Sequence, residues 1–211
     1  MSTIKTSVVL EAGPNTDIWK KPPTTNIWTA PISHTSSGLL KNFQSARVTF
    51  WADWKERYDQ GGLLLVPKRR PAAHVSPPEQ WIKTGVEYYL GEPQLSTVST
   101  DRFADWSVAR LTLGEDERAP AEVGGVTIEI AREGDEHGKS LWVYRLVLDA
   151  SSGGVAERIP LREICWVLAD EDEAGGDEWL LDVSPLVARP EKNATESLKV
   201  DFKTFEVQWR S

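Results

Sequence analysis

The feature that most constrains the fold is an alternation of polar and apolar residues, repeated in short segments along nearly the whole chain. Most of these segments are rich in β-branched or aromatic residues and are bounded by glycine, proline, aspartate or asparagine. This alternation is the period of a β-strand, in which successive side chains point to opposite faces of a sheet. Few windows have the 3.6-residue period of an amphipathic helix. The chain is therefore predicted to be all-β.

The predicted strands follow one another with turn residues between them. They span residues 6–10, 46–52, 62–66, 80–90, 96–100, 106–113, 123–131, 140–149, 158–168, 179–183 and 200–208. Many short strands in this arrangement are typical of an antiparallel two-sheet sandwich or jelly roll. No internal repeat and no long linker divides the 211 residues, so we predict a single domain over 1–211.

Charge and cysteine content exclude several classes of protein. The formal net charge is −8, whereas a nucleic-acid-binding domain presents a basic face. No apolar run approaches the length of a membrane-spanning helix, and the N-terminus lacks the pattern of a signal peptide. The one cysteine, Cys165, lies in an apolar run, so it is predicted to be buried, and a lone thiol indicates a reducing compartment. We predict a cytoplasmic protein, monomeric or a weak homodimer, with no nucleic-acid or membrane partner.

The predicted strand 80–90 carries polar residues that suggest a ligand site. One of its faces is apolar and belongs in the core, and the other carries Trp81, Lys83, Gly85, Glu87 and Tyr89. Lys83 and Glu87 lie about 13 Å apart along the strand, and Gly85 between them leaves an open floor for a small polar ligand. The alternative interpretation is two solvated charges on an outer surface, where Lys and Glu are common.

Two neighbouring strands add polar groups to this face. Gln60 shares a strand face with a glycine, and Asp105 shares a strand face with Ser107. Because isolated Asp and Gln are unfavourable in strands, their presence indicates specific partners. The residues predicted to converge on one concave sheet face, with the aromatic ones at its edges, are Gln60, Trp81, Lys83, Glu87, Tyr89 and Asp105.

Motifs that name a reaction are absent from the sequence. None of the three histidines has metal-ligand spacing, and neither a Gly-x-Ser-x-Gly elbow nor a glycine-rich phosphate loop is present. The acidic segment 170–178 could bind a cation, but it lacks the oxygen spacing of an EF-hand and is predicted to be a solvated loop. A basic, proline-rich insertion at 67–78 is predicted to be a long loop. We therefore predict no metal and no cofactor, and an enzyme of this sequence would use Lys, Glu, Asp or Tyr for proton transfer.

Several motifs resemble, in order and spacing, those of the regulation-of-enolase-protein-like family of bacteria and fungi, over nearly the whole chain. They are WTAP at 28–31, ADW at 52–54, YDQGGL at 58–63, WIKTGVE at 81–87, DWSV at 105–108, LRE at 161–163 and VDFKTF at 200–205. The resemblance implies a concanavalin-like (lectin/glucanase) jelly roll of two curved antiparallel sheets, whose concave sheet is the usual binding face. It implies no general catalytic mechanism, although the namesake fungal protein is linked to central carbon metabolism.

Three functions remain open at this point. The first is a metabolic or regulatory protein that binds a small polyhydroxylated or anionic metabolite through Tyr58, Gln60, Lys83, Glu87 and the aromatic edges. The second is a cofactor-free isomerase, lyase or cyclase of fungal specialised metabolism. In it Glu87 or Asp105 would be the base, and Lys83 or Tyr58 would stabilise an oxyanion. The third is a protein-interaction module that uses a tryptophan-rich surface.

Overall fold

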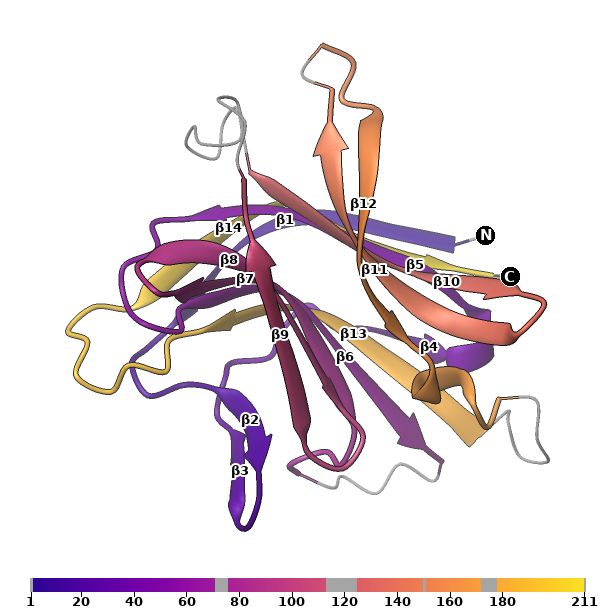
Figure 1. The fold of residues 1–211 in the computed structure, drawn as a ribbon, viewed down its shortest axis with the longest axis horizontal. Coiled ribbons are helices and arrows are strands. Elements are labelled where there is room, and N and C mark those ends of the chain that lie inside the picture. The colour runs from indigo at the N-terminus through magenta and orange to yellow at the C-terminus, as the bar shows by residue number, and fades with distance from the viewer. Residues whose placement is uncertain (1, 71–75, 113–124, 150, 172–177, 211) are drawn as a thin grey trace.

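The computed structural model is a sandwich of two six-stranded antiparallel sheets and describes residues 2–70, 76–112, 125–149, 151–171 and 178–210 (Figure 1). In spatial order, sheet 1 contains β1 (Ser2–Ala12), β14 (Leu198–Trp209), β5 (Phe43–Ala52), β10 (Val126–Asp135), β11 (Gly138–Leu148) and β12 (Val155–Ile164). Sheet 2 contains β4 (Ser36–Leu39), β13 (Trp179–Ala188), β6 (Gln60–Arg69), β7 (Trp81–Tyr89), β8 (Glu92–Thr100) and β9 (Ala104–Arg110). The predicted all-β, two-sheet architecture is confirmed.

The core lies between the two sheets, where alternate side chains of both meet. Val48 and Phe50 of sheet 1 pack there with Leu63 and Ile82 of sheet 2, and all four are fully buried. Because strand side chains alternate, the same strands must present a second set of residues on their outer faces. In sheet 2 this outer face carries the candidate site.

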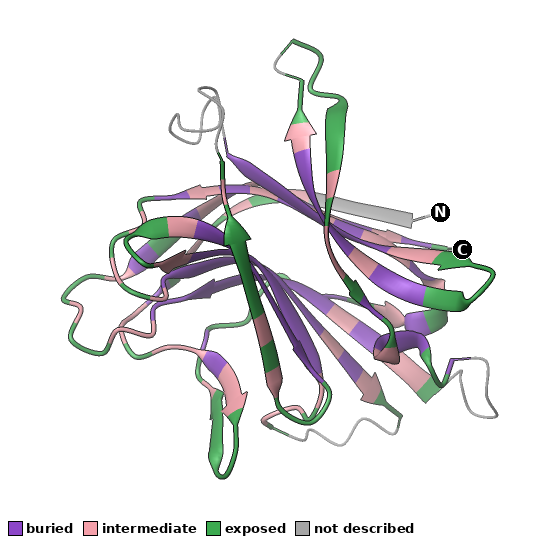
Figure 2. Ribbon diagram, viewed as in Figure 1, coloured by how far each residue is buried: buried purple, intermediate pink, exposed green. Residues whose placement is uncertain are grey.

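A small hairpin covers part of the outer face of sheet 2. It consists of β2 (Ile18–Lys21) and β3 (Thr25–Trp28), and its tip is exposed (Figures 1 and 2). Ile18 packs with Leu64, Trp81 and Leu186 in a second apolar cluster. Sheet 2 is therefore buried on both faces beneath the hairpin, which explains why every residue from Trp81 to Glu87 is buried. The sequence did not predict this hairpin.

The structure differs from several sequence predictions at the ends of strands. The predicted strand 158–168 ends at Ile164, and the 3-10 turn η2 (Trp166–Leu168) follows it. Cys165 lies at this turn and is exposed, so the prediction of a buried thiol is wrong. The predicted loop 67–78 starts too early, because β6 continues to Arg69; its residues 71–75, and residues 172–177 of the acidic segment, lie outside the described residues. The helical elements η2 and η1 (Leu40–Asn42) are single 3-10 turns, and no helix among the described residues could span a membrane.

Candidate functional site

Five polar residues gather on the outer face of sheet 2, close to the hairpin. This group, the polar cluster, consists of Asp17, Gln60, Lys83, Glu87 and Ser96. The register pairs Gln60 of β6 with Glu87 of β7, and Gly85 of β7 with Ser96 of β8. The two-residue period of β7 then places Lys83 on the same face. Three of the residues predicted from sequence, Gln60, Lys83 and Glu87, are thus brought together.

Lys83 is held at the hairpin side of the polar cluster. Its Nζ donates hydrogen bonds to Gln60 Oε1 at 2.8 Å and to Asp17 Oδ1 at 3.2 Å. The same Nζ lies 5.7 Å from the ring centre of Trp19 and 5.9 Å from that of Trp81. Only 5% of the Lys83 side chain is exposed. Burying an ammonium group is unfavourable unless it is paired, so Asp17 and the two rings stabilise its charge.

Glu87 lies at the other side of the polar cluster and is also buried. Ser96 Oγ donates to Glu87 Oε2 at 2.8 Å, and Trp106 Nε1 donates to Ser96 Oγ at 3.0 Å. Burial raises the pKa of Glu87 above its ordinary value, although the positive charge of Lys83 and the hydrogen bond from Ser96 act in the opposite direction. Lys83 and Glu87 influence each other electrostatically without an ion pair between them.

The space between Lys83 and Glu87 is a small hollow and not an open groove. It measures about 10 Å³ and is lined by residues that include Gln60, Gly85 and Leu186. Such a volume holds roughly one water molecule, whereas metabolite pockets measure roughly 300–1,000 Å³. The predicted open floor at Gly85 is therefore wrong. A Cβ on Gly85 would lie 2.0 Å from the Gly61 carbonyl oxygen, so glycine is required there by the close approach of β6.

Three aromatic rings, the aromatic group, stand beside the polar cluster. Tyr58 and Tyr89 stack with ring centres 5.6 Å apart and 12° between their planes, and Trp106 meets Tyr89 edge-on at 5.1 Å. The Arg57 guanidinium carbon lies 4.5 Å from the Tyr58 ring centre. Tyr58 has a φ of 68°, a left-handed conformation that is uncommon for a bulky side chain and that recurs at functional sites. Because all three rings are only partly buried, they form the accessible side of the site.

Of the other two predicted site residues, Trp81 lies beside Lys83 but is covered, and Asp105 lies on the opposite sheet face. Trp81 is 1% exposed and packs against Trp28 of the hairpin, so it is covered instead of standing at an open edge. Asp105 lies opposite Ser99 on the inner face of sheet 2, where its carboxylate accepts a hydrogen bond from Arg162 of β12. Alternation along β9 therefore brings Trp106 to the site in place of Asp105. The pattern of one strand does not reveal its register with the next, and a shift of one residue exchanges the two faces.

Four further residues around the site were not predicted from the sequence: Asp17, Trp19, Ser96 and Trp106. Ser96 and Trp106 lie in segments predicted to be strands, and alternation would have placed them on the site face had the register been known. Asp17 and Trp19 carry no comparable signal, because they reach the site only through the hairpin. Asp17 is 43 positions from Gln60 and 66 from Lys83.

Replacing Glu87 by glutamine should stabilise the fold at neutral pH and change it least near pH 4. A carboxyl group whose pKa is raised by folding contributes stability when it is protonated, and that contribution is lost as the pH rises through the folded-state pKa. Glutamine stays neutral, so the difference in unfolding free energy between Glu87→Gln and the native chain should grow from pH 4 to pH 7. Urea unfolding at several pH values measures it, with the exposed Glu157→Gln as control. Destabilisation at pH 7 would mean that the carboxylate's bond to Ser96 outweighs its burial.

Fold and site together define an all-β sandwich with a charged cluster on an outer sheet face, partly covered by a hairpin. The family model DUF1349, described as a protein of unknown function, matches residues 1–155, and the chain belongs to this family. The uncharacterized protein AN7484 of Emericella nidulans is 38% identical over 199 residues, which cover 94% of this chain and 84% of that protein.

Solved structures share the fold. A functionally unknown protein from Saccharomyces cerevisiae aligns over 96% of this chain and 88% of its own, with 18% identity and a TM-score of 0.66. The GH43 protein BlXynB from Bacillus licheniformis, in a mutant form, aligns over 96% of this chain but only 33% of its own, with 10% identity and a TM-score of 0.50. At these identities the likeness concerns the β-sandwich alone. Among the described residues, no group of three or more His, Cys, Asp or Glu side chains could hold a metal ion.

Proposed function

We propose that the protein binds a small anionic or polyhydroxylated metabolite on the outer face of sheet 2, in a metabolic or regulatory role. The observation that carries this proposal is the buried Lys83 ammonium, whose carboxylate partner comes from the hairpin segment and not from the sheet. A buried ion pair contributes little to stability by itself, because desolvating both charges offsets their attraction. A buried charge at this position, next to the buried Glu87 and the partly exposed aromatic group, is suited to recognising a ligand.

Asp17 marks the position that an anionic group of the ligand would take. Its Oδ1 accepts hydrogen bonds from Lys83 Nζ, from Gln60 Nε2 at 3.2 Å and from the Ile18 backbone N–H at 2.7 Å. A carboxylate or similar group of the ligand would accept the same two side-chain donors. The rings or hydroxyl groups of the ligand would then lie against the aromatic group, Tyr58, Tyr89 and Trp106.

Entry of such a ligand requires the hairpin to move, because the present hollow holds about one water. A two-stranded hairpin is only marginally stable without packing against another surface. The hairpin is attached by Ile18 in the apolar cluster, by Trp19 edge-on to Trp106 at 6.4 Å, and by the Asp17 contacts. Lifting it exposes Lys83 and Trp81 without disturbing either sheet.

Replacing Lys83 by methionine should weaken binding of the ligand at least tenfold, because a charge-assisted hydrogen bond contributes about 1.5–3 kcal/mol. The measurement is calorimetric titration with citrate, malate, gluconate and benzoate, which vary charge, hydroxyl content and ring character. The control is Lys192→Met, at an exposed position outside the site. Equal binding by Lys83→Met and the native chain would contradict the proposal, as would the absence of any binding to the native chain. Unfolding curves of both variants verify that they are folded.

A second candidate function is a cofactor-free isomerase, lyase or cyclase that uses the same site. The raised pKa of Glu87 favours it, because a buried carboxyl group near a lysine is suited to transfer protons. Asp105 is no longer a candidate base, since it lies on the opposite face of β9. The variant Glu87→Gln distinguishes the two functions. If Glu87 transfers the proton, this variant should still bind the ligand but should no longer catalyse the reaction.

Three finer predictions accompany this proposal. The lone Cys165 supports a reducing, cytoplasmic location. The formal net charge of −8 supports a monomer or weak homodimer, because like-charged copies repel one another. The motifs at 58–63 and 81–87 support the regulation-of-enolase-protein-like relationship and, with it, a concanavalin-like jelly roll.

A further inference from the structure

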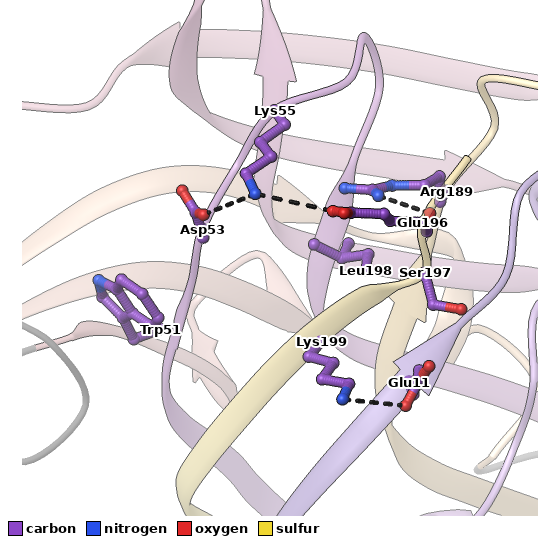
Figure 3. A pocket seen from close by; sticks show the side chains of 9 residues that line it. All are labelled: Glu11, Trp51, Asp53, Lys55, Arg189, Glu196, Ser197, Leu198 and Lys199. Atoms are coloured by element: carbon purple, nitrogen blue, oxygen red, sulfur yellow. Dashed lines mark hydrogen bonds and ion pairs between the residues drawn. The ribbon is translucent and has the colours of Figure 1, made fainter. Parts of the chain in front are cut away.

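A second, larger hollow lies at one end of sheet 1, away from the polar cluster. It measures about 500 Å³, which is enough for one or two sugar rings. Figure 3 shows the residues that line it, from strands β1, β5 and β14 and from the segments that follow β5 and β13 and precede β14. We propose that this hollow is a second binding site, for a neutral, hydroxyl-rich ligand such as a short oligosaccharide.

Trp51 provides the wall on which a sugar ring would pack. Its indole lies at one side of the hollow, opposite Glu196 and Ser197 (Figure 3), and it is only partly buried. Trp51 belongs to the outer face of sheet 1, where its neighbour in the register is the polar Asp201. A flat aromatic face contacts the C–H groups of a pyranose ring and leaves the equatorial hydroxyl groups free to hydrogen bond.

The charges around the hollow favour a neutral ligand. Three acids, Glu11, Asp53 and Glu196, line the hollow with two exposed bases, Lys55 and Lys199, whereas the charge of Arg189 is already paired with that of the buried Asp59. Lys55 lies 3.0 Å from Asp53 and 3.9 Å from Glu196, and Lys199 lies 3.7 Å from Glu11. The excess of acid repels an anionic ligand, whereas hydroxyl groups can accept from the lysines and donate to the carboxylates.

One buried ion pair fixes both sides of the hollow. Arg189 Nη1 donates to the Glu196 carbonyl oxygen at 2.7 Å, and the Lys55 backbone N–H donates to Asp59 Oδ2 at 3.1 Å. Arg189 and Asp59 are themselves joined by two hydrogen bonds and are almost fully buried. The segments that carry Lys55 and Glu196 are therefore held in place before a ligand arrives, which lowers the entropy lost on binding.

The test is calorimetric titration of the native chain with four sugars: xylotetraose, cellotetraose, laminaritetraose and maltotetraose. At least one of them should bind with a dissociation constant of about 1 mM or tighter. Trp51→Ala should weaken that binding fivefold or more, and Lys199→Ala should weaken it as well. The matched control is Trp142→Ala, because Trp142 is also partly buried on the outer face of sheet 1 but lies outside the hollow.

Three results would overturn the inference: no binding of any of the four sugars, unchanged binding by Trp51→Ala, or equal weakening by Trp142→Ala. A sugar whose binding is weakened by Trp51→Ala but not by Lys83→Met binds in this hollow and not at the polar cluster. The two proposals therefore stand or fall separately, since citrate and its companions test Lys83 while the tetrasaccharides test Trp51. Unfolding curves of the Trp51→Ala and Lys199→Ala variants verify that each is folded before its affinity is compared.

Discussion

Replacing Gly85 by alanine should lower the unfolding free energy by about 3 kcal/mol or more, because overpacking a rigid interior forces the backbone to shift. A Cβ at this position would lie 2.0 Å from the Gly61 carbonyl oxygen and 2.7 Å from the Gly62 Cα. Both contacts are with backbone, and backbone of a central strand pair cannot move aside as a flexible side chain can. Urea unfolding followed by tryptophan fluorescence measures the change.

The matched control for this substitution is Gly13→Ala. A Cβ on Gly13 would meet nothing within 4 Å, and its backbone is not in the left-handed region. Its unfolding free energy should therefore stay within about 0.5 kcal/mol of the native value. If Gly85→Ala were as mild as Gly13→Ala, β6 and β7 could separate at this point, and the close approach of the two strands would not be what requires glycine.

Alternation within β7 predicted correctly that Lys83 and Glu87 lie on one sheet face, because alternation depends only on local geometry. Lys83 and Glu87 are four residues apart on one strand, so they share a face whatever the neighbouring strands do. The same rule separated Asp105 from Trp106 but did not say which of them faces the site. That choice depends on the register of β9 against β8, which is fixed by the whole sheet.

The hairpin explains the larger error, the prediction of an open groove. Each of its strands has only four residues, too few for a clear alternation. Its packing on sheet 2 turns an outer, solvent-facing surface into a buried one, and it brings Asp17 to Lys83. The sequence therefore predicted the strands and the polar residues well, whereas burial and the partner of Lys83 depend on a distant segment.

Residues 53–60 connect the two candidate sites. The segment begins with Asp53 and Lys55 at the second hollow and ends with Tyr58 and Gln60 at the first. Asp59 lies between these positions and is fully buried. Its carboxylate accepts the backbone N–H groups of Lys55 and Glu56 and both hydrogen bonds from Arg189. A single buried carboxylate thus fixes the conformation of a segment that contributes to both sites.

Replacing Asp59 by alanine should lower the unfolding free energy by about 3–5 kcal/mol, because it leaves the Arg189 guanidinium buried without its counter-charge. The pair is bidentate, with Arg189 Nε to Asp59 Oδ1 at 2.8 Å and Arg189 Nη2 to Asp59 Oδ2 at 2.7 Å. Only 3% of the Arg189 side chain and none of the Asp59 side chain is exposed. The backbone N–H groups of Lys55 and Glu56 lose their acceptor as well.

Two further variants separate the ion pair from the loss of the loop's hydrogen bonds. Arg69→Met breaks an exposed ion pair with Glu178 and should change the unfolding free energy by about 1 kcal/mol or less. The double variant Asp59→Ala, Arg189→Met should lose less stability than the sum of its single variants, because the second change removes the unpaired charge that the first one leaves. Additive losses would contradict this account. They would show that Asp59 acts mainly by accepting the N–H groups of its own segment, and both candidate sites should then be altered by Asp59→Ala alone.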